Sequence, residues 1–528
     1  MYLFKVLNKK KYALCFLNAL IENICLYAMP VVLSIFLTLP FSLEKFRNFI
    51  ILTIILKILE RICNMIWFIK VEPFLEFTKK DLQIAYFKRI CNMNIIKLNE
   101  IHTGYLKKQL DTVLEESNLL LDEMMMTING FVVAISIFLF QVWTQSRILF
   151  LVCIVFIIVT VIYNVAITKK NIEVQEEYND TNAGYNATFV DFLQNVKIVK
   201  RFDAIDYSVN TSNKKFEKVK RPIKRLNFFT SMRYDGISLL VYFMYFVILI
   251  SLYFQMKSGA DVFSYVVFYS SMFIGIGDEL TGVARLFIHY NKFKSANHQV
   301  EEMIVEEEKQ SKIRNFKNIT LKDIEFQYDK ESDICIKIPN FSIDKYDKVS
   351  IMGESGQGKS TFLSLFCRFY PISDDFYLTD GTPSSKAVDV AYISQEVDLF
   401  DLTIKENLCL GKNVSDEMLE EYLEEAGLID WVNHLEKGLD TMVGEKGVKL
   451  SSGQKQRLNI IRGILLDKDI YILDEPTSNL DVTSEEKICH MIDKYLKHKT
   501  CIIVTHRKKL AEICNKHYIF ENREMKEC

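Results

Sequence analysis

The chain has 528 residues, too many for one ordinary hydrophobic core, so we expect several structural units. Hydrophobic residues make up 49% of the chain and charged residues 25%. This composition is expected if an apolar part of the chain is joined to a charged part. The net charge of −2 argues against a nucleic-acid-binding protein, which would carry a strongly basic domain.

Six long apolar runs occupy the N-terminal half of the chain. They cover 13–38, 47–69, 126–145, 148–167, 237–256 and 262–288. Each is close to the ~20 residues that a helix needs to cross the hydrocarbon core of a bilayer. The first contains Glu22 and Asn23 and has no small-residue cleavage site, so we expect a retained span rather than a signal peptide.

Two long basic connections lie between spans 2 and 3 and between spans 4 and 5. They contain the segments TKKDLQIAYFKR and NKKFEKVKRPIKR, whereas the short connections hold few basic residues. By the positive-inside tendency, the long connections and both termini are cytoplasmic. Their periodic apolar positions predict helical extensions of the spans. Extensions of some 25 residues would reach roughly 40 Å beyond the bilayer.

The charged segment EEMIVEEEKQSKIRN follows the last span. Beyond it, short β-branched runs such as DIYILDEP and TCIIVTH alternate with helical patterns, which predicts a largely parallel α/β sheet. We therefore predict an α-helical membrane domain with six transmembrane helices, fused to an α/β domain. The expected limits are 1–300 for the membrane domain, 301–315 for a linker and 316–528 for the α/β domain.

A phosphate-binding loop is predicted in KVSIMGESGQGKSTFLSLF, where Gly353-x4-Gly358-Lys359-Ser360 lies between an apolar run and a helical pattern. Glycines let the backbone fold closely around phosphates, the lysine adds positive charge, and the serine hydroxyl ligates Mg²⁺. The loop predicts that the α/β domain at 316–528 is a P-loop NTPase domain that binds ATP. The residues expected to bind ATP here are Gly353, Glu354, Ser355, Gly356, Gln357, Gly358, Lys359, Ser360 and Thr361.

Two acidic residues end the apolar run in DIYILDEPTSNLD. The carboxyl end of a buried parallel strand is where open α/β sheets bind their ligands. We expect Asp474 to be a ligand of the magnesium ion and Glu475 to act as the general base toward the attacking water.

With these motifs, the C-terminal part of the chain resembles the nucleotide-binding domain of ABC transporters, and the whole chain resembles a half-size ABC exporter. Further matching segments are EFQYDKE, AYISQEVDLF and IIVTHR. The resemblance implies that Tyr328 stacks on adenine, that Gln395 senses magnesium as a further ligand, and that His506 contacts the γ-phosphate as a catalytic residue together with Glu475 and Lys359.

The segment LSSGQ, at 450–454, resembles the ABC signature loop, with Ser452 where the family usually has Gly. The resemblance implies that Ser451, Ser452, Gly453 and Gln454 close over the ATP of a second subunit, so that the chain works as a dimer. A homodimer is favoured, and a heterodimer with another half-transporter is the alternative. The region between Gly381 and Val390 is shorter than usual.

The resemblance also implies a function. The chain is expected to couple ATP hydrolysis to alternating access in its helices through segments near 100–108 and 206–216. The predicted activity is export of a peptide, a lipid or a hydrophobic small molecule, and an ATP-gated channel or sensor is the alternative.

The Lys-, Ile- and Asn-rich composition favours an AT-rich bacterial genome, and hence a bacterial plasma membrane.

Charged residues within the predicted spans are candidates for substrate contact, because a charge facing lipid is costly. They are Glu22, Lys57, Glu60, Arg61, Asp278, Glu279 and Arg285. Lys57 and Glu60 have the spacing of an i,i+3 ion pair. The acidic pair at 278–279 has two interpretations, either as a site for a cationic or peptide substrate or as an ion pair with Arg285, and we favour the second.

Overall fold

The structure is a computed structural model that describes residues 3–528 apart from 39, 41, 94–96, 99, 100, 102, 260, 305–311, 314, 329–334, 371, 445, 446 and 448. The chain divides into two compact units, one within Met1–Met93 and Ile101–Val305 and one within Glu306–Cys528. The linker expected at 301–315 lies partly outside the described residues, and its first three residues belong to the last helix of the first unit.

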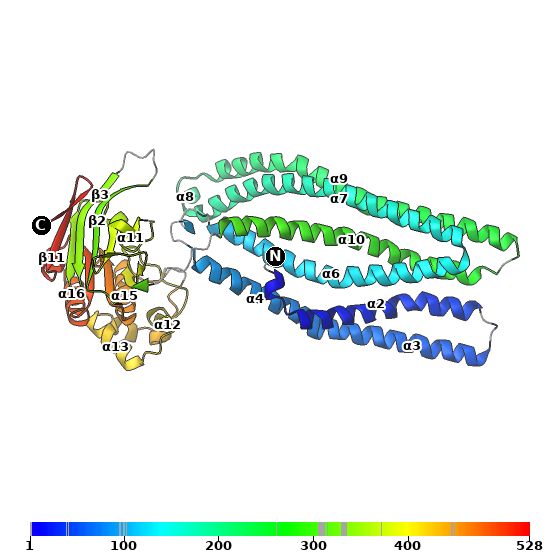
Figure 1. Ribbon diagram of the computed structural model, residues 1–528, viewed down its shortest axis with the longest axis horizontal. Helices are drawn as coiled ribbons and strands as arrows, with labels where there is room; N and C mark the ends of the chain where they lie inside the picture. The colour runs from blue at the N-terminus through cyan, green and yellow to red at the C-terminus, as the bar shows by residue number, and fades with distance from the viewer. Residues whose placement is uncertain are drawn as a thin grey trace. The chain divides into compact units, whose positions relative to one another are not determined.

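The first unit is built of helices, several of them long (Figure 1). They are α1 (Leu3–Val6), α2 (Lys9–Thr38), α3 (Leu43–Ile66), the π-helical turn η1 (Trp67–Val71), α4 (Glu72–Cys91), α6 (Thr103–Gln145), α7 (Arg147–Gln194), α8 (Val196–Arg201), α9 (Ile205–Lys257) and α10 (Phe263–Met303).

The length of these helices confirms that the basic connections continue the predicted spans. Helix α9 has 53 residues, and at 1.5 Å per residue it is about 80 Å long, far more than a bilayer core requires. The chain turns between α7 and α9 at 195–204. The coupling segment expected at 206–216 therefore lies inside α9, beyond this turn. His102, at the edge of the first coupling segment, lies outside the described residues.

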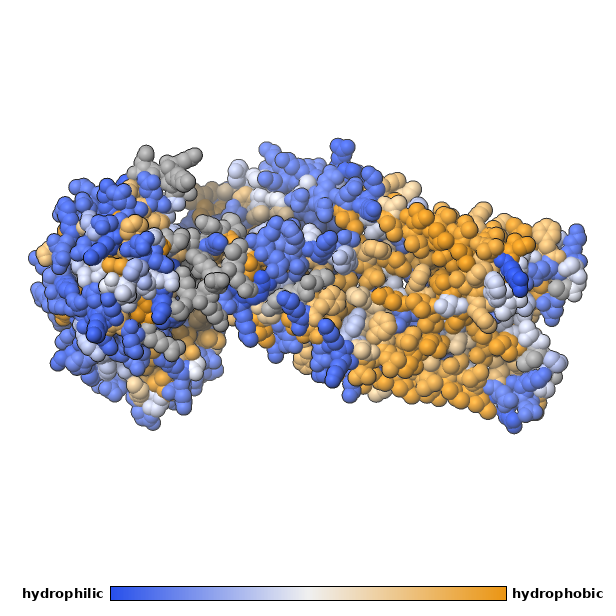
Figure 2. All heavy atoms as spheres, viewed as in Figure 1, coloured by the Kyte–Doolittle hydropathy of each residue, from blue (hydrophilic) through white to orange (hydrophobic). Residues whose placement is uncertain are grey.

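Among the described residues, four helices are long and apolar enough to cross a membrane, namely α2, α6, α7 and α9. The other two predicted spans fall within α3 and α10, where charged residues interrupt the apolar sequence. Figure 2 shows hydrophobic residues in a broad band over this unit, with hydrophilic residues at both of its ends. Large apolar side chains of these helices are exposed, for example Ile54, Ile58, Leu151, Ile162 and Phe246. An exposed apolar surface of this extent is what a lipid-facing surface requires.

Lys57 and Glu60 have the partners that local spacing predicts. Lys57 Nζ lies 2.6 Å from Glu60 Oε2, which confirms the i,i+3 pair. Glu22 of α2 has a partner that is distant in the sequence: its Oε1 accepts a hydrogen bond from Asn64 Nδ2 of α3 at 3.5 Å, while its Oε2 is buried without a hydrogen bond.

The expected ion pair between the acidic residues of α10 and Arg285 does not form. Arg285 Nε instead donates to Glu123 Oε1 of α6 at 2.8 Å. Glu279 Oε1 accepts a hydrogen bond of 2.7 Å from the hydroxyl of Tyr27 in α2, and Asp278 is exposed. The prediction was wrong because the register between α6 and α10 brings another carboxylate to the arginine.

The second unit has a central sheet with helices around it. Its strands are β1 (Lys312–Ile313), β2 (Asn318–Gln327), β3 (Cys335–Asp344), β4 (Lys348–Gly353), β5 (Tyr377–Thr379), β6 (Thr382–Pro383), β7 (Ala387–Val388), β8 (Val390–Ile393), β9 (Ile470–Asp474), β10 (Thr500–Val504), β11 (Lys516–Glu521) and β12 (Glu524–Glu527). Its helices are α11 (Lys359–Phe366), η2 (Asp374–Phe376), α12 (Ile404–Cys409), α13 (Asp416–Glu425), α14 (Ile429–Asn433), η3 (Gly438–Asp440), α15 (Ser452–Leu465), α16 (Val482–Tyr495) and α17 (Lys508–Glu512).

The main sheet has the strand order β6-β5-β2-β3-β12-β11-β4-β10-β9-β8, and β1 pairs separately with β7. The run β11-β4-β10-β9-β8 is parallel throughout. The strands β6, β5, β2 and β3 pair antiparallel, so an antiparallel part adjoins the parallel sheet that the sequence predicts. Because β4, β10, β9 and β8 are parallel neighbours, the loops after their carboxyl ends meet at one edge of the sheet.

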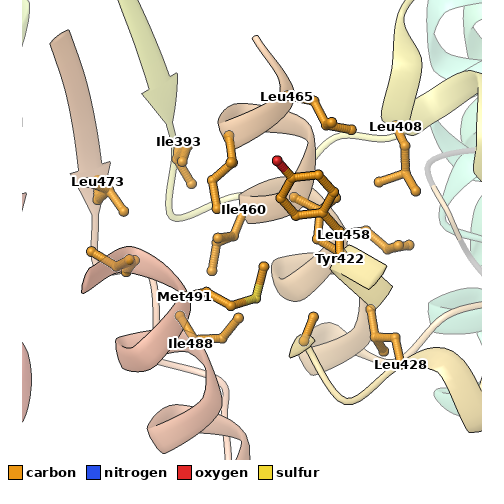
Figure 3. Packing of buried hydrophobic residues seen from close by; sticks show 14 of the residues in the cluster. Ile393, Leu408, Tyr422, Leu428, Leu458, Ile460, Leu465, Leu473, Ile488 and Met491 are labelled. Atoms are coloured by element: carbon orange, nitrogen blue, oxygen red, sulfur yellow. The ribbon is translucent and has the colours of Figure 1, made fainter. Parts of the chain in front are cut away.

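Helix α15 is anchored by its apolar face. Figure 3 shows Leu458, Ile460 and Leu465 of this helix among buried side chains from the neighbouring strands and helices. Ile393 of β8 and Leu473 of β9 belong to the same cluster. The packing fixes the helix against the two strands whose ends carry candidate site residues.

Candidate nucleotide site

The phosphate-binding loop connects β4 to α11, as the sequence predicted. Lys359 is the first residue of α11, and its Nζ donates to the main-chain oxygens of Gly353 and Glu354 at 2.5 and 2.8 Å. Burial lowers the pKa of Lys359, while the carboxylates of Glu475 and Asp474 act in the opposite direction. The ammonium group is therefore held inside the loop, where a phosphate would receive its charge.

Two glycines of this loop meet requirements that other residues would not. Gly353 has φ +139°, and a Cβ there would lie 2.7 Å from the main-chain oxygen of Phe520. Gly358 has φ +114° and lies close to the side chain of Ile336. Both a left-handed backbone and a close neighbour exclude larger residues at these positions. Ser360 and the neighbouring loop residues Glu354, Ser355 and Gly356 are exposed.

Tyr328 follows β2 directly and reaches the start of α11. Its hydroxyl lies 2.5 Å from Thr361 Oγ1, and its ring makes edge contacts with Phe326 and Tyr370 at 5.3 and 5.5 Å between centroids. Half of the tyrosine remains exposed. An aromatic surface beside the phosphate loop is suited to a nucleobase, as expected for Tyr328.

The remaining predicted residues follow three neighbouring strands. Gln395 follows β8, Asp474 ends β9 with Glu475 directly after it, and His506 follows β10. Gln395 Nε2 donates to Glu475 Oε2 at 2.7 Å, and His506 Nε2 lies 3.5 Å from Glu475 Oε1. His506 Nε2 is also 3.5 Å from Lys359 Nζ. The structure thus gathers Gln395, Glu475, His506 and Lys359 into one cluster.

Asp474 is held by a residue that the sequence analysis missed. The hydroxyl of Tyr392, in β8, donates to Asp474 Oδ2 at 3.3 Å. Burial raises the pKa of Asp474, and the hydrogen bond from Tyr392 counteracts this effect. Tyr392 alternates with apolar residues in a strand, so its sequence position alone suggests an ordinary core residue.

Gln456 is a second residue that sequence reasoning missed. It is 1% exposed, and its Nε2 donates to the main-chain oxygen of Glu475 at 2.8 Å. Its Oε1 accepts a bond of 3.2 Å from the main-chain N–H of Asn479. Glu475 itself has φ +47°, an uncommon backbone conformation for a glutamate. The signal in the sequence is an uncharged polar residue at a position where the helical pattern of α15 predicts an apolar one.

The signature segment forms the start of α15. Ser451 is the N-cap, and its Oγ accepts from the main-chain N–H of Gln454 at 3.2 Å. Gln454 Oε1 accepts in return from the main-chain N–H of Ser451 at 2.9 Å. This reciprocal capping box stabilises the helix within its own subunit. Ser452 is exposed, whereas a Cβ at Gly453 would lie 3.3 Å from the main-chain oxygen of Asn479.

The donor set fits a magnesium ion carried by a nucleotide. Ser360, Gln395 and Asp474 offer a hydroxyl, an amide and a carboxylate, and Mg²⁺ prefers such oxygen ligands with few of them from the protein. Among the described residues, no group of three or more His, Cys, Asp or Glu side chains is arranged to hold a metal without other ligands. Phosphate oxygens would have to complete this coordination.

Two family models match the chain. The model for the ABC transporter transmembrane region matches residues 12–277, and the model for ABC transporter matches residues 336–478. The chain is similar in structure to a bacterial Atm1-family ABC exporter with ATP bound. The TM-score is 0.82 at 20% identity, and the match covers 98% of this chain and 94% of that one, which establishes a shared fold.

Curated relatives match a shorter part of the chain. An ATP-dependent lipid A-core flippase of Idiomarina loihiensis is 38% identical over 216 residues, which is 39% of this chain and 37% of that protein. A Staphylococcus aureus (strain NCTC 8325 / PS 47) protein named for multidrug export is 39% identical over 211 residues, which is 39% of this chain and 36% of the relative. The alignments thus span little more than a third of these relatives.

Proposed function

The chain belongs to the ABC transporter family, and we propose that it is a half-transporter that uses ATP hydrolysis to export a substrate across the plasma membrane. The proposal is supported by the fusion of apolar spanning helices and an ABC-type nucleotide site in one chain. Its two termini lie on the cytoplasmic side, where ATP is available, and its source is a bacterium. This orientation follows from the basic connections between the spans.

ATP binds at the loop between β4 and α11. Lys359 neutralises phosphate charge, and the main chain around Gly356, which has φ +80° and open space beside it, accommodates the phosphate oxygens. Tyr328 packs against the adenine. Ser360, Gln395 and Asp474 hold Mg²⁺, which when bound stabilises the negative charge that develops on the phosphates.

The position of the Glu475 carboxylate is the observation that best supports hydrolysis of ATP by this chain. The carboxylate lies at a strand end, between the side chains of Gln395 and His506. A carboxylate in this position accepts a proton from the attacking water, while His506 contacts the γ-phosphate. Gln456 keeps the backbone of Glu475 in the conformation that directs the carboxylate toward the site.

A second half-transporter completes each site. In the proposed dimer, Ser451, Ser452, Gly453 and Gln454 of one subunit close over the ATP bound by the other. Two bound nucleotides draw the domains together, and hydrolysis lets them separate. We favour a homodimer because Glu475 and His506 are both present, and a heterodimer remains the alternative.

The substrate is a peptide, a lipid or a hydrophobic small molecule. The relatives named for lipid A-core flipping and for multidrug export support an amphiphilic or apolar substrate. The long apolar helices offer a path for such a molecule between the cytoplasmic side and the outer side of the membrane.

Sealed vesicles containing the purified protein test this function. A library of labelled peptides, lipids and hydrophobic small molecules is supplied with ATP, and accumulation against a gradient is measured. Uphill accumulation that stops in the Glu475→Gln variant supports an ATP-driven pump. Movement that only follows the gradient, with ATP changing its rate, would instead assign the chain to the ATP-gated channels.

A further inference from the structure

One arginine continues the buried apolar stripe of α9. Between residues 252 and 233 of α9, the buried residues are Leu252, Ile248, Met244, Val241, Ile237 and Arg233. Arg233 is 5% exposed. It therefore occupies, one turn beyond Ile237, a position where the pattern of the helix places an apolar side chain.

Two nitrogen atoms of the Arg233 guanidinium lack hydrogen-bond partners. Its Nε and Nη1 are buried and make no hydrogen bond, and none of the carboxylates that the structure describes forms an ion pair with it. The group lies 4.7 Å from the ring centroid of its neighbour Tyr234, a contact that compensates only part of the lost hydration. Proteins usually retain a buried charged side chain when it is paired with an opposite charge or when it binds a ligand.

The surroundings of Arg233 are polar and positively charged. Helix α7 contacts α9 just before Arg233, where Asn171 Nδ2 donates to Thr230 Oγ1 at 2.9 Å and the hydroxyl of Tyr163 donates to the main-chain oxygen of Met232 at 2.7 Å. In the same region Asn164, buried in α7, donates to the main-chain oxygen of Leu280 in α10.

Arg285 of α10 is close enough for its charge to act on Arg233. The carboxylate of Glu123 is already bonded to Arg285 and to the hydroxyl of Thr127, at 2.8 and 2.6 Å. One arginine is therefore neutralised by the protein, and the other, Arg233, retains its full charge.

We propose that Arg233 binds an anionic group, a phosphate or a carboxylate, on the molecule that this chain transports. The unpaired Nε and Nη1 atoms offer two donors to two oxygen atoms of such a group. The inference rests on the proposed export function, and it replaces the expectation of a cationic substrate. Glu279, which suggested a cation, is bonded to Tyr27.

Dodecyl phosphate is a suitable probe, because it joins a phosphate to an apolar chain. The full-length protein is placed in nanodiscs of phosphatidylcholine, and binding is measured by calorimetry without ATP. Inorganic phosphate and dodecyltrimethylammonium are titrated in parallel. We expect dodecyl phosphate to bind and dodecyltrimethylammonium not to bind. Binding of inorganic phosphate as well identifies a free anion as the ligand, and its failure to bind identifies the head group of an amphiphile.

The Arg233→Gln variant is expected to weaken dodecyl phosphate binding about tenfold or more, because a hydrogen-bonded charge is lost. Arg225 lies on the same helix, but is half exposed and paired with Glu177. The matched Arg225→Gln variant is expected to bind the probe as the parent does. Equal binding by Arg233→Gln and the parent would overturn the proposal, as would preferential binding of dodecyltrimethylammonium.

The Arg233→Met variant tests whether Arg233 serves to bind a ligand or to stabilise the protein. Since no carboxylate among the described residues pairs with Arg233, we expect Arg233→Met to keep or raise the melting temperature of the ligand-free protein. A clear fall in melting temperature together with unchanged probe binding would assign Arg233 to protein packing or to a partner subunit. These readouts do not depend on ATP, so failure of the export assay alone would leave the anion site standing.

Discussion

The side-chain amide of Gln456 donates a hydrogen bond to the main-chain oxygen of Glu475, with 2.8 Å between the nitrogen and the oxygen. The bond joins α15, which starts at the signature segment, to the residue that follows the apolar part of β9. The main-chain N–H of Glu475 also donates to the oxygen of Val504 at 2.9 Å. Two neighbours thus hold Glu475 at its positive φ, which fixes the direction of its carboxylate.

Replacement of Gln456 by Met keeps most of the side-chain volume and removes its three hydrogen bonds to the loop after β9. We expect kcat for ATP hydrolysis to fall ~10- to 100-fold, because displacement of a positioned catalytic group by a fraction of an ångström has effects of this size. The KM for ATP should change little, since Gln456 makes its recorded contacts to Glu475, Ser478 and Asn479 and none to the phosphate loop. Phosphate release over a range of ATP concentrations, with the melting temperature as a control, checks this. An unchanged kcat would show that the loop holds its conformation without Gln456.

The two small residues of the signature segment are expected to differ in their tolerance of substitution. A Cβ at Gly453 would lie 3.3 Å from Asn479 O and 3.4 Å from Leu480 Cδ2, so Gly453→Ala should displace the loop after β9 and lower kcat roughly tenfold. Ser452 is exposed, and Ser452→Gly should leave kcat within about twofold. Measuring the ATPase rates of both variants decides the comparison. A large change in Ser452→Gly alone would mean that the serine hydroxymethyl limits closure of the site.

Tandem dimers, in which two copies are joined by a linker, test whether a site is shared between subunits. Lys359→Ala disables a phosphate loop and Ser451→Arg blocks a signature segment. In a Glu475→Gln background, we expect a dimer with one change in each copy to retain about half of the ATP held by the parent dimer. A dimer with both changes in one copy should retain no ATP. The altered copy lacks a working phosphate loop for one shared site and a working signature segment for the other. The opposite pattern would place each nucleotide within a single chain.

The sequence predicts residues at strand ends well, and long-range partners poorly. Lys359, Glu475 and His506 each adjoin an apolar run, and parallel strands bring such ends to one edge, so their proximity follows from pattern alone. The partner of Arg285 depends on how α6 and α10 are aligned, which no local pattern determines. The same holds for Gln456 and Tyr392, whose contacts with Glu475 and Asp474 cross from one element to another.

Hydrolysis of ATP by the Glu475→Gln variant tests the central claim most directly. The change keeps the shape of the side chain and removes its basicity, so phosphate release should fall by ~10²-fold or more while ATP still binds. Lys359→Ala serves as the comparison, because it should weaken ATP binding itself. If the purified Glu475→Gln protein releases phosphate at the parent rate, Glu475 is not the general base and the proposed ATP-driven cycle is contradicted.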